Sequence, residues 1–413
     1  MRLRRGLALA AASAGIVLLL AALAAALLLQ PQRLAHLVLD GVGDGFDLDI
    51  AFDGEARYRL RGTPLLEVHG LVVRRPDDGQ PLLRAERALV SLPWSSVRER
   101  SAPLMIHRIE LDAPVLDLPR LQAWLAARPR GDGALPTLSD GLAVRDGRVL
   151  GKGWELQDLA LELPRLAADE PLSATARGRL AMAPPLAIAF DLRLAATRPA
   201  SGAGASARGA LDIEHGDWRI PATVVASGPL HAGDGVLRVA PLRFGSVGEF
   251  RGQGAPLPFA LGLHGPLRLR DGTWTLVPAT VALRGGDVVP DFDARGRAAL
   301  GPALVVELDG RLPRWPRGWP ALPPPLDAPD QPSEVALAYA GRSDLSDPLR
   351  LRMRRGGASG EARGRVADVF AWVDAAATGS PLPPLDMRAS VPRLEVAGAV
   401  VEGLELTIEG DAP

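Results

Sequence analysis

Histidines and clustered acidic residues are the groups through which this chain could hold a metal or transfer protons. The six histidines show no His-x-x-x-His or comparable ligand spacing, which favours structural or loop roles for them. Asp40, Asp44, Asp47 and Asp49 lie close together but miss the calcium-loop pattern, and the last two occupy outward positions of an expected strand. The glycine-rich residues 41–45 precede a strand, whereas a phosphate-binding loop precedes a helix. We therefore expect no metal site and no cofactor.

Hydrolytic chemistry is also not favoured. The sequence has no Gly-x-Ser-x-Gly nucleophile motif, although its many acids could include a carboxylate pair for glycoside hydrolysis. A polysaccharide cleft normally needs aromatic platforms, and aromatic residues make up only 4% of this chain. We expect a protein that is not an enzyme.

Composition narrows the class of partner. The chain contains no cysteine, so disulfides and thiolate metal sites are impossible. Its 47 basic and 48 acidic residues nearly cancel, and no long basic stretch follows the N-terminal segment. A nucleic-acid partner is not expected, because such proteins carry a concentrated positive surface.

The N-terminus predicts a membrane anchor. Arg2, Arg4 and Arg5 precede an uninterrupted apolar run over residues 6–29. A bilayer core about 30 Å thick needs about 20 apolar residues, whereas the apolar part of a cleavable signal spans about 7–15. A cleavable signal is the alternative, but the run continues past the small-residue step at 22–24. We expect an uncleaved single-pass helix whose basic flank is cytoplasmic.

Alternation with period two dominates the rest of the sequence. Leu186, Ile188, Phe190 and Leu192 share one parity with polar or small residues between them, as expected of a strand with one apolar face. The same alternation occurs at 46–50, 109–112, 159–163, 335–339 and 404–409. Asp-Gly pairs, which favour tight hairpins, occur at 53–54, 78–79, 146–147, 234–235, 271–272 and 309–310.

These patterns predict a mainly β fold, a long curved antiparallel sheet with a few short helices. Helical spacing occurs at 119–128, at 366–373 and over 93–100. Residues 198–208 are small and polar and are expected to form a mobile loop. Residues 312–332 hold eight prolines with Trp315 and Trp319, which indicates a stiff loop or linker.

Several strand motifs follow one another in an order that resembles the AsmA-like family of Gram-negative envelope proteins. The motifs follow the single anchor, and the resemblance is firmest over residues 1–200. The stretches that carry it are 45–50, 65–71, 82–92, 106–118, 144–149 and 154–163.

The resemblance implies an inner-membrane protein related to bridge-like lipid transfer proteins, with a periplasmic β-groove for acyl chains. The expected parts are a cytoplasmic N-terminus and anchor (1–31), a groove domain (32–311), the proline-rich segment (312–332) and continuing strands with a short helix (333–413). The candidate lining residues are Leu186, Ile188, Phe190, Leu192, Leu404, Leu406 and Ile408.

The implied function is (phospho)lipid transport or outer-membrane homeostasis. Expected partners are membrane phospholipids, the inner membrane through residues 6–29, and an envelope protein at the C-terminal end. The alternative is an assembly module that docks outer-membrane or secretion proteins by adding a strand to an exposed sheet edge.

Overall fold

A computed structural model describes most of the chain after residue 46. The described residues are 47–59, 62–91, 105–127, 137–182, 186–233, 235–252, 254–319, 321–328, 330–343, 345–365, 368, 385–396 and 399–409. The expected anchor at 6–29, the expected helix at 93–100 and all of 366–373 except Asp368 lie outside them.

No helix within these ranges has the length and apolar character needed to cross a bilayer.

The fold is mainly β, as the alternation predicts, and the described residues form 22 strands and the helix α4 (Leu118–Ala127). Contacts divide the chain into two compact units. The first is Met1–Gly151 with Asp158–Leu166, and the second is Lys152–Gln157 with Ala167–Pro413. The proline-rich segment therefore lies inside the second unit.

Strands β1 to β7 belong to the first unit, which has a small core formed mainly by β3 and β4. The strands are β1 (Asp49–Phe52), β2 (Ala56–Arg59), β3 (Leu65–Arg74), β4 (Pro81–Ser91), β5 (Met105–Asp112), β6 (Val115–Asp117) and β7 (Thr137–Leu150). Both β1 and β2 pair with β3, which pairs with β4. Val68, Leu71, Val73, Ala85 and Ala88 from β3 and β4 are buried together. Strand β8 (Trp154–Leu163) contributes residues to both units.

The expectation of an antiparallel sheet is wrong at β7, although the pairings among β1 to β6 are antiparallel. Strands β5 and β6 both run parallel to β7, and α4 connects β6 to β7. Two neighbouring parallel strands need a crossover because a tight hairpin cannot join their ends. The helix expected at 119–128 is that crossover.

Asp117 begins α4, since its carboxylate accepts a hydrogen bond from the Arg120 backbone N–H at 3.0 Å, as an N-cap residue does. Leu121 and Trp124 are half-buried, but Leu125 is 55% exposed. A helix packed on one side buries only a narrow stripe, so Leu125 stays largely in solvent.

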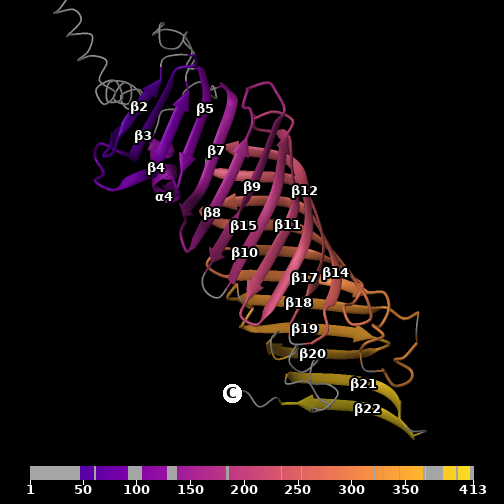
Figure 1. The fold of residues 1–413 in the computed structure, drawn as a ribbon. Coiled ribbons are helices and arrows are strands. Elements are labelled where there is room, and N and C mark those ends of the chain that lie inside the picture. Colours follow the sequence, from indigo (N-terminus) through magenta and orange to yellow (C-terminus); the bar gives the residue numbers. More distant parts are fainter. Residues whose placement is uncertain are drawn as a thin grey trace, which may run out of the picture. The chain divides into compact units, whose positions relative to one another are not determined.

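The second unit contains a continuous antiparallel meander from β9 to β22, in which each strand pairs with the next. Its strands are β9 (Leu172–Met182), β10 (Leu186–Ala196), β11 (Ala203–His215), β12 (Trp218–Gly233), β13 (Val236–Phe250), β14 (Leu257–Arg270), β15 (Thr273–Gly285), β16 (Phe292–Leu300), β17 (Leu304–Leu312), β18 (Ser333–Gly341), β19 (Pro348–Arg355), β20 (Ala358–Arg365), β21 (Asp386–Val396) and β22 (Ala399–Ile408). Figure 1 shows the strand direction turning between β9 and β20, as the natural twist of a sheet requires.

Two local signals misled the sequence analysis in this unit. The stretch 198–208 is not one loop, because β11 starts at Ala203 and pairs with both β10 and β12. Asp271-Gly272 does form the expected turn, with φ of 49° and 76°. Asp309-Gly310 instead lies inside β17, as Asp146-Gly147 lies inside β7 of the first unit.

Gly310 occurs inside a strand because there is no room for a side chain. A Cβ at this position would lie 2.5 Å from the Asp293 carbonyl oxygen and 2.6 Å from Cε2 of Phe292. A Cβ at Gly245, also inside a strand, would meet nothing within 4 Å.

We predict that Gly310→Ala lowers the free energy of unfolding by about 1–3 kcal/mol, since overpacking forces neighbours to move. The matched variant Gly245→Ala should stay within about 0.5 kcal/mol of wild type in urea unfolding. Equal losses in both variants would contradict this packing account.

An arginine–carboxylate network stabilises the first unit. The Arg108 Nε donates to Glu110 at 2.6 Å, and Arg87 lies 3.5 Å and Arg145 3.6 Å from the same carboxylate. The hydrogen bond from Arg108 lowers the pKa of Glu110 below its usual value of 4.5. A carboxyl with a depressed folded-state pKa stabilises the fold above its unfolded pKa and loses that contribution as the pH falls through the folded value.

We therefore predict that Glu110→Gln destabilises the protein at neutral pH and that this deficit shrinks below about pH 4. Thermal unfolding midpoints measured across pH test this, with Glu86→Gln on the exposed side of β4 as the control. A deficit for Glu110→Gln that does not change with pH would show that the ionised carboxylate is not the stabilising group.

Candidate functional site

The two faces of the sheet in the second unit differ in chemistry. On β10 the expected lining residues Leu186, Ile188, Phe190 and Leu192 are half-buried, whereas Asp191 between them is exposed. We call the side that carries Phe190 the apolar face and the side that carries Asp191 the polar face. Residues paired directly across neighbouring strands share a face, so the register shows how far each face extends.

The apolar face continues through the whole meander without a polar residue in its central row. Beginning on β9 and ending on β22, successive partners in this row are Ala174, Leu194, Ala207, Ala226, Phe244, Leu263, Val281, Ala294, Gly310, Val335, Met353, Gly360, Ala389 and Leu406. A parallel row runs from Ala279 on β15 to Ile408 on β22 through partners that are all apolar or glycine.

These rows bring the two groups of candidate lining residues onto the same face. Leu194 on β10 and Leu406 on β22 are members of one row, and Leu404 pairs with Val391 on that face. Leu404 and Ile408 are half-buried, while Leu406 is 41% exposed. The candidates therefore lie at distant ends of one apolar surface, and they do not form one compact cluster.

Most of the apolar face is formed by residues that the sequence analysis did not single out. Phe259, Leu261 and Leu263 on β14 face the same side as Phe244 on the neighbouring strand. The alternation of these residues in the sequence was a usable signal. It was obscured by Pro258 and by the glycines at 262 and 265, which resemble turn signals.

Among the described residues, large side chains bury only part of this face. Phe190, Phe244 and Leu263 are only half-buried, and among the described residues Ser333 is the largest side chain that is fully buried. A closed core would bury such leucines and phenylalanines completely. Accessible apolar area therefore remains along much of the meander.

The proline-rich segment covers part of the apolar face. Trp319 packs with Phe292, Leu312 and Val335, which are buried at the positions where β16, β17 and β18 contribute to that face. The indole Nε1 of Trp319 donates to the Val288 carbonyl at 2.9 Å. The prolines alone indicated a stiff loop or linker, and they gave no sign that the segment covers part of the apolar face. The two tryptophans were the signal, because large apolar rings usually pack against something.

Arg355, which is only 6% exposed, fixes the proline-rich segment in place. Its Nε donates to the Leu326 carbonyl at 2.7 Å and its Nη2 donates to the Ala328 carbonyl at 2.7 Å. Its Nη1 donates to the Gln331 carbonyl and to Ser333 Oγ. Burial removes water from the guanidinium and lowers the pKa of Arg355. The carbonyl oxygens that accept its hydrogen bonds take the place of that water.

On the polar face, several arginine side chains form ion pairs with carboxylates. Arg297 donates to both carboxylate oxygens of Glu307 at 2.9 and 2.6 Å, and these hydrogen bonds lower the pKa of Glu307. Arg219 and Asp212 form a similar pair, which lowers the pKa of Asp212. Such exposed pairs contribute little stability, but they keep this face soluble.

Within the described ranges, no three His, Asp or Glu side chains lie close enough together to hold a metal ion. The described histidines are dispersed over β3, β5, β11, β12 and β14.

Comparisons with protein-family models, with curated proteins and with solved structures found no match to this chain.

We predict that Arg355→Gln releases the proline-rich segment while the strands remain paired. Several charge-assisted hydrogen bonds to the segment would be lost, and each normally contributes about 1.5–3 kcal/mol. Hydrogen–deuterium exchange should increase at 313–332 and remain slow in β12 to β14. The control is Arg354→Gln, whose side chain is exposed on the same strand. Unchanged exchange at 313–332 in Arg355→Gln would contradict this role for the guanidinium.

Proposed function

We propose that this protein binds lipid acyl chains on its apolar face and supports phospholipid transport or outer-membrane homeostasis. One observation carries the proposal, namely the unbroken apolar row from β9 to β22 with half-buried Leu and Phe side chains along it. A sheet that leaves such a face accessible in water needs something to cover it.

Hydrocarbon tails are suitable occupants for physical reasons. Burying apolar surface contributes about 25 cal/mol per Å², so two acyl chains could be held without any specific polar contact. The headgroup would stay in water, which makes broad selectivity among phospholipids the natural outcome. Binding and transfer would break no covalent bond, in agreement with a protein that is not an enzyme.

The resemblance to the AsmA-like family supports the same proposal and gives it a location. An anchor at residues 6–29 would place the N-terminus in the cytoplasm and the sheet in the periplasm, attached to the inner membrane. Phospholipids would then be available beside the attachment point.

Photocrosslinking in living cells tests the proposal with neighbouring residues on opposite faces. A photoreactive amino acid at Phe190 should transfer its label to phospholipid, and the same amino acid at Asp191 should give only background. A second pair, Leu404 and Glu405 on β22, tests whether the far end of the apolar face behaves in the same way. The products are identified by mass spectrometry of the full-length chain purified from its native membrane. Equal lipid labelling from Phe190 and Asp191, or none from either, would contradict acyl-chain binding.

A second candidate function is docking of an envelope protein by strand addition. Among the residues that the structure describes, β22 pairs with β21 alone, and its Val400 and Val401 are 49% and 39% exposed. An accessible strand edge with apolar side chains is a template for another strand. Protein adducts from Leu404 in place of lipid adducts would favour this alternative.

A further inference from the structure

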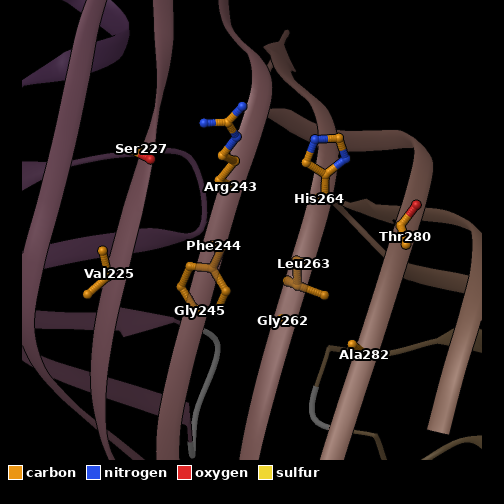
Figure 2. A pocket seen from close by; sticks show the side chains of 10 residues that line it. All are labelled: Val225, Ser227, Arg243, Phe244, Gly245, Gly262, Leu263, His264, Thr280 and Ala282. Carbon is orange, nitrogen blue, oxygen red and sulfur yellow. The ribbon is translucent and has the colours of Figure 1, made fainter.

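A shallow hollow of about 450 Å³ lies on the opposite, polar face of the sheet, over β12 to β15. Figure 2 shows the side chains around it, with Ser227, Arg243 and His264 towards one end and Val225 and Ala282 towards the other. The volume is within the range of small-molecule sites, which is about 300–1,000 Å³. Eight of the lining residues lie on the polar face by strand register, and Phe244 and Leu263, whose side chains belong to the apolar face, complete the lining.

One end of the hollow is polar. Ser227, Arg243, His264 and Thr280 are successive partners across β12, β13, β14 and β15, so the four side chains form a single row. The row contains two hydroxyls, one imidazole and one permanent positive charge, but no carboxylate.

The neighbouring row, on the same face, is apolar. Its members are Val225, Gly245, Gly262 and Ala282. A Cβ at Gly245 would meet nothing within 4 Å, so the two facing glycines leave an open floor. Val225 is 55% exposed, and Val247, one row further along, is 66% exposed. These two valines are among the most exposed large apolar side chains of the described residues.

Among the described residues, the positive charge beside the hollow has no counterion. Arg243 takes part in no ion pair or side-chain hydrogen bond with the described residues, although other arginines of this face do, such as Arg297 with Glu307. Arg208 is the partner of Val225 and directly faces Arg193 on β10, so two like charges lie opposite each other nearby. Like charges opposite each other destabilise a sheet, and a bound anion would relieve that repulsion.

We propose that this hollow is a second ligand site, for a small amphipathic anion. The anionic group would bind Arg243 and the hydroxyls of the polar row, and the hydrocarbon part would lie over Gly245 and Gly262 towards Val247. Carboxylates of medium-chain fatty acids have this chemistry. The inference does not depend on the proposed function, because it concerns the other face of the sheet.

The test uses octanoate carrying a diazirine on its chain, added to native membranes that contain the full-length protein, with the matching diazirine octanol as the neutral probe. After irradiation, the labelled peptides are mapped by mass spectrometry. Octanoate should label the segments around Val225 and Val247 at least about fivefold more than octanol, because a charge-assisted contact is lost in the alcohol.

Two variants separate the two ends of the site. Arg243→Gln should reduce octanoate labelling about fivefold or more and leave octanol labelling unchanged. Gly245→Leu should abolish labelling of the hollow by both probes, since its side chain would occupy the open floor. Arg354→Gln removes the same charge from the polar face of β19, outside the hollow, and should change nothing.

Equal labelling by octanoate and octanol, or no effect of Arg243→Gln, would overturn the anion site. Labelling confined to the segments around Phe190 and Leu404 would also overturn it, but that result would agree with the proposed acyl-chain binding on the apolar face. Loss of phospholipid adducts from Phe190 together with intact labelling at Val225 would overturn the proposed function alone.

Discussion

The structure of the second unit depends on keeping the strand register in phase with the period-two alternation of side chains. A slip of one residue at any strand pair would turn every apolar side chain of the following strand to the polar face. Small residues help to hold this phase where bulky ones lie opposite them. Phe190 pairs with Gly178 on one side, and Phe244 pairs with Ala226. Size complementarity across strands thus adds to the backbone hydrogen bonds in selecting one register.

A sheet that is largely a single layer solves the burial problem differently from most domains, which bury one sheet face against a second layer. Here the cover is partial. Trp319 and the segment fixed by Arg355 protect the positions around Phe292 and Val335, which form a buried apolar cluster. Elsewhere most residues of the same row, Phe244 and Leu263 among them, are half-buried, and Leu406 is exposed. The protein therefore combines a locally closed core with a long accessible apolar surface, and each follows from the same sequence alternation.

Structural features that depend on residues close in sequence could be predicted, whereas those that depend on contacts between distant segments could not. Alternation is local, so strands such as β10 and β22 and the mainly β class followed from the sequence. The parallel pairing of β5 with β7 did not, because it depends on the crossover through α4. Gly310 looked like part of a turn because the ring of Phe292, which explains the glycine, lies on the neighbouring strand. The packing of Trp319 was missed for the same reason.

The candidate residues illustrate the same limit for function. Leu186 to Leu192 could be recognised because they lie on one strand, but the surface they belong to is defined by partners on many strands. The polar-face hollow was not recognised because its polar end has one residue from each of four strands. Ser227, Arg243, His264 and Thr280 have no common motif in the sequence. Such sites are assembled by register alone, and single-sequence patterns do not encode register.

The alternation of side chains gives the two faces different chemistry, although both faces are built on the same strand backbones. Arg243 and Phe244 are neighbours in sequence, as are Leu263 and His264, yet each pair divides between the polar and the apolar face. A substitution on one face therefore need not alter the chemistry of the other. Because the backbone of β13 and β14 is common to both faces, a ligand that changes the local twist on one side necessarily changes the spacing of side chains on the other. The twist of these two strands is therefore a route by which a ligand on one face could affect the other.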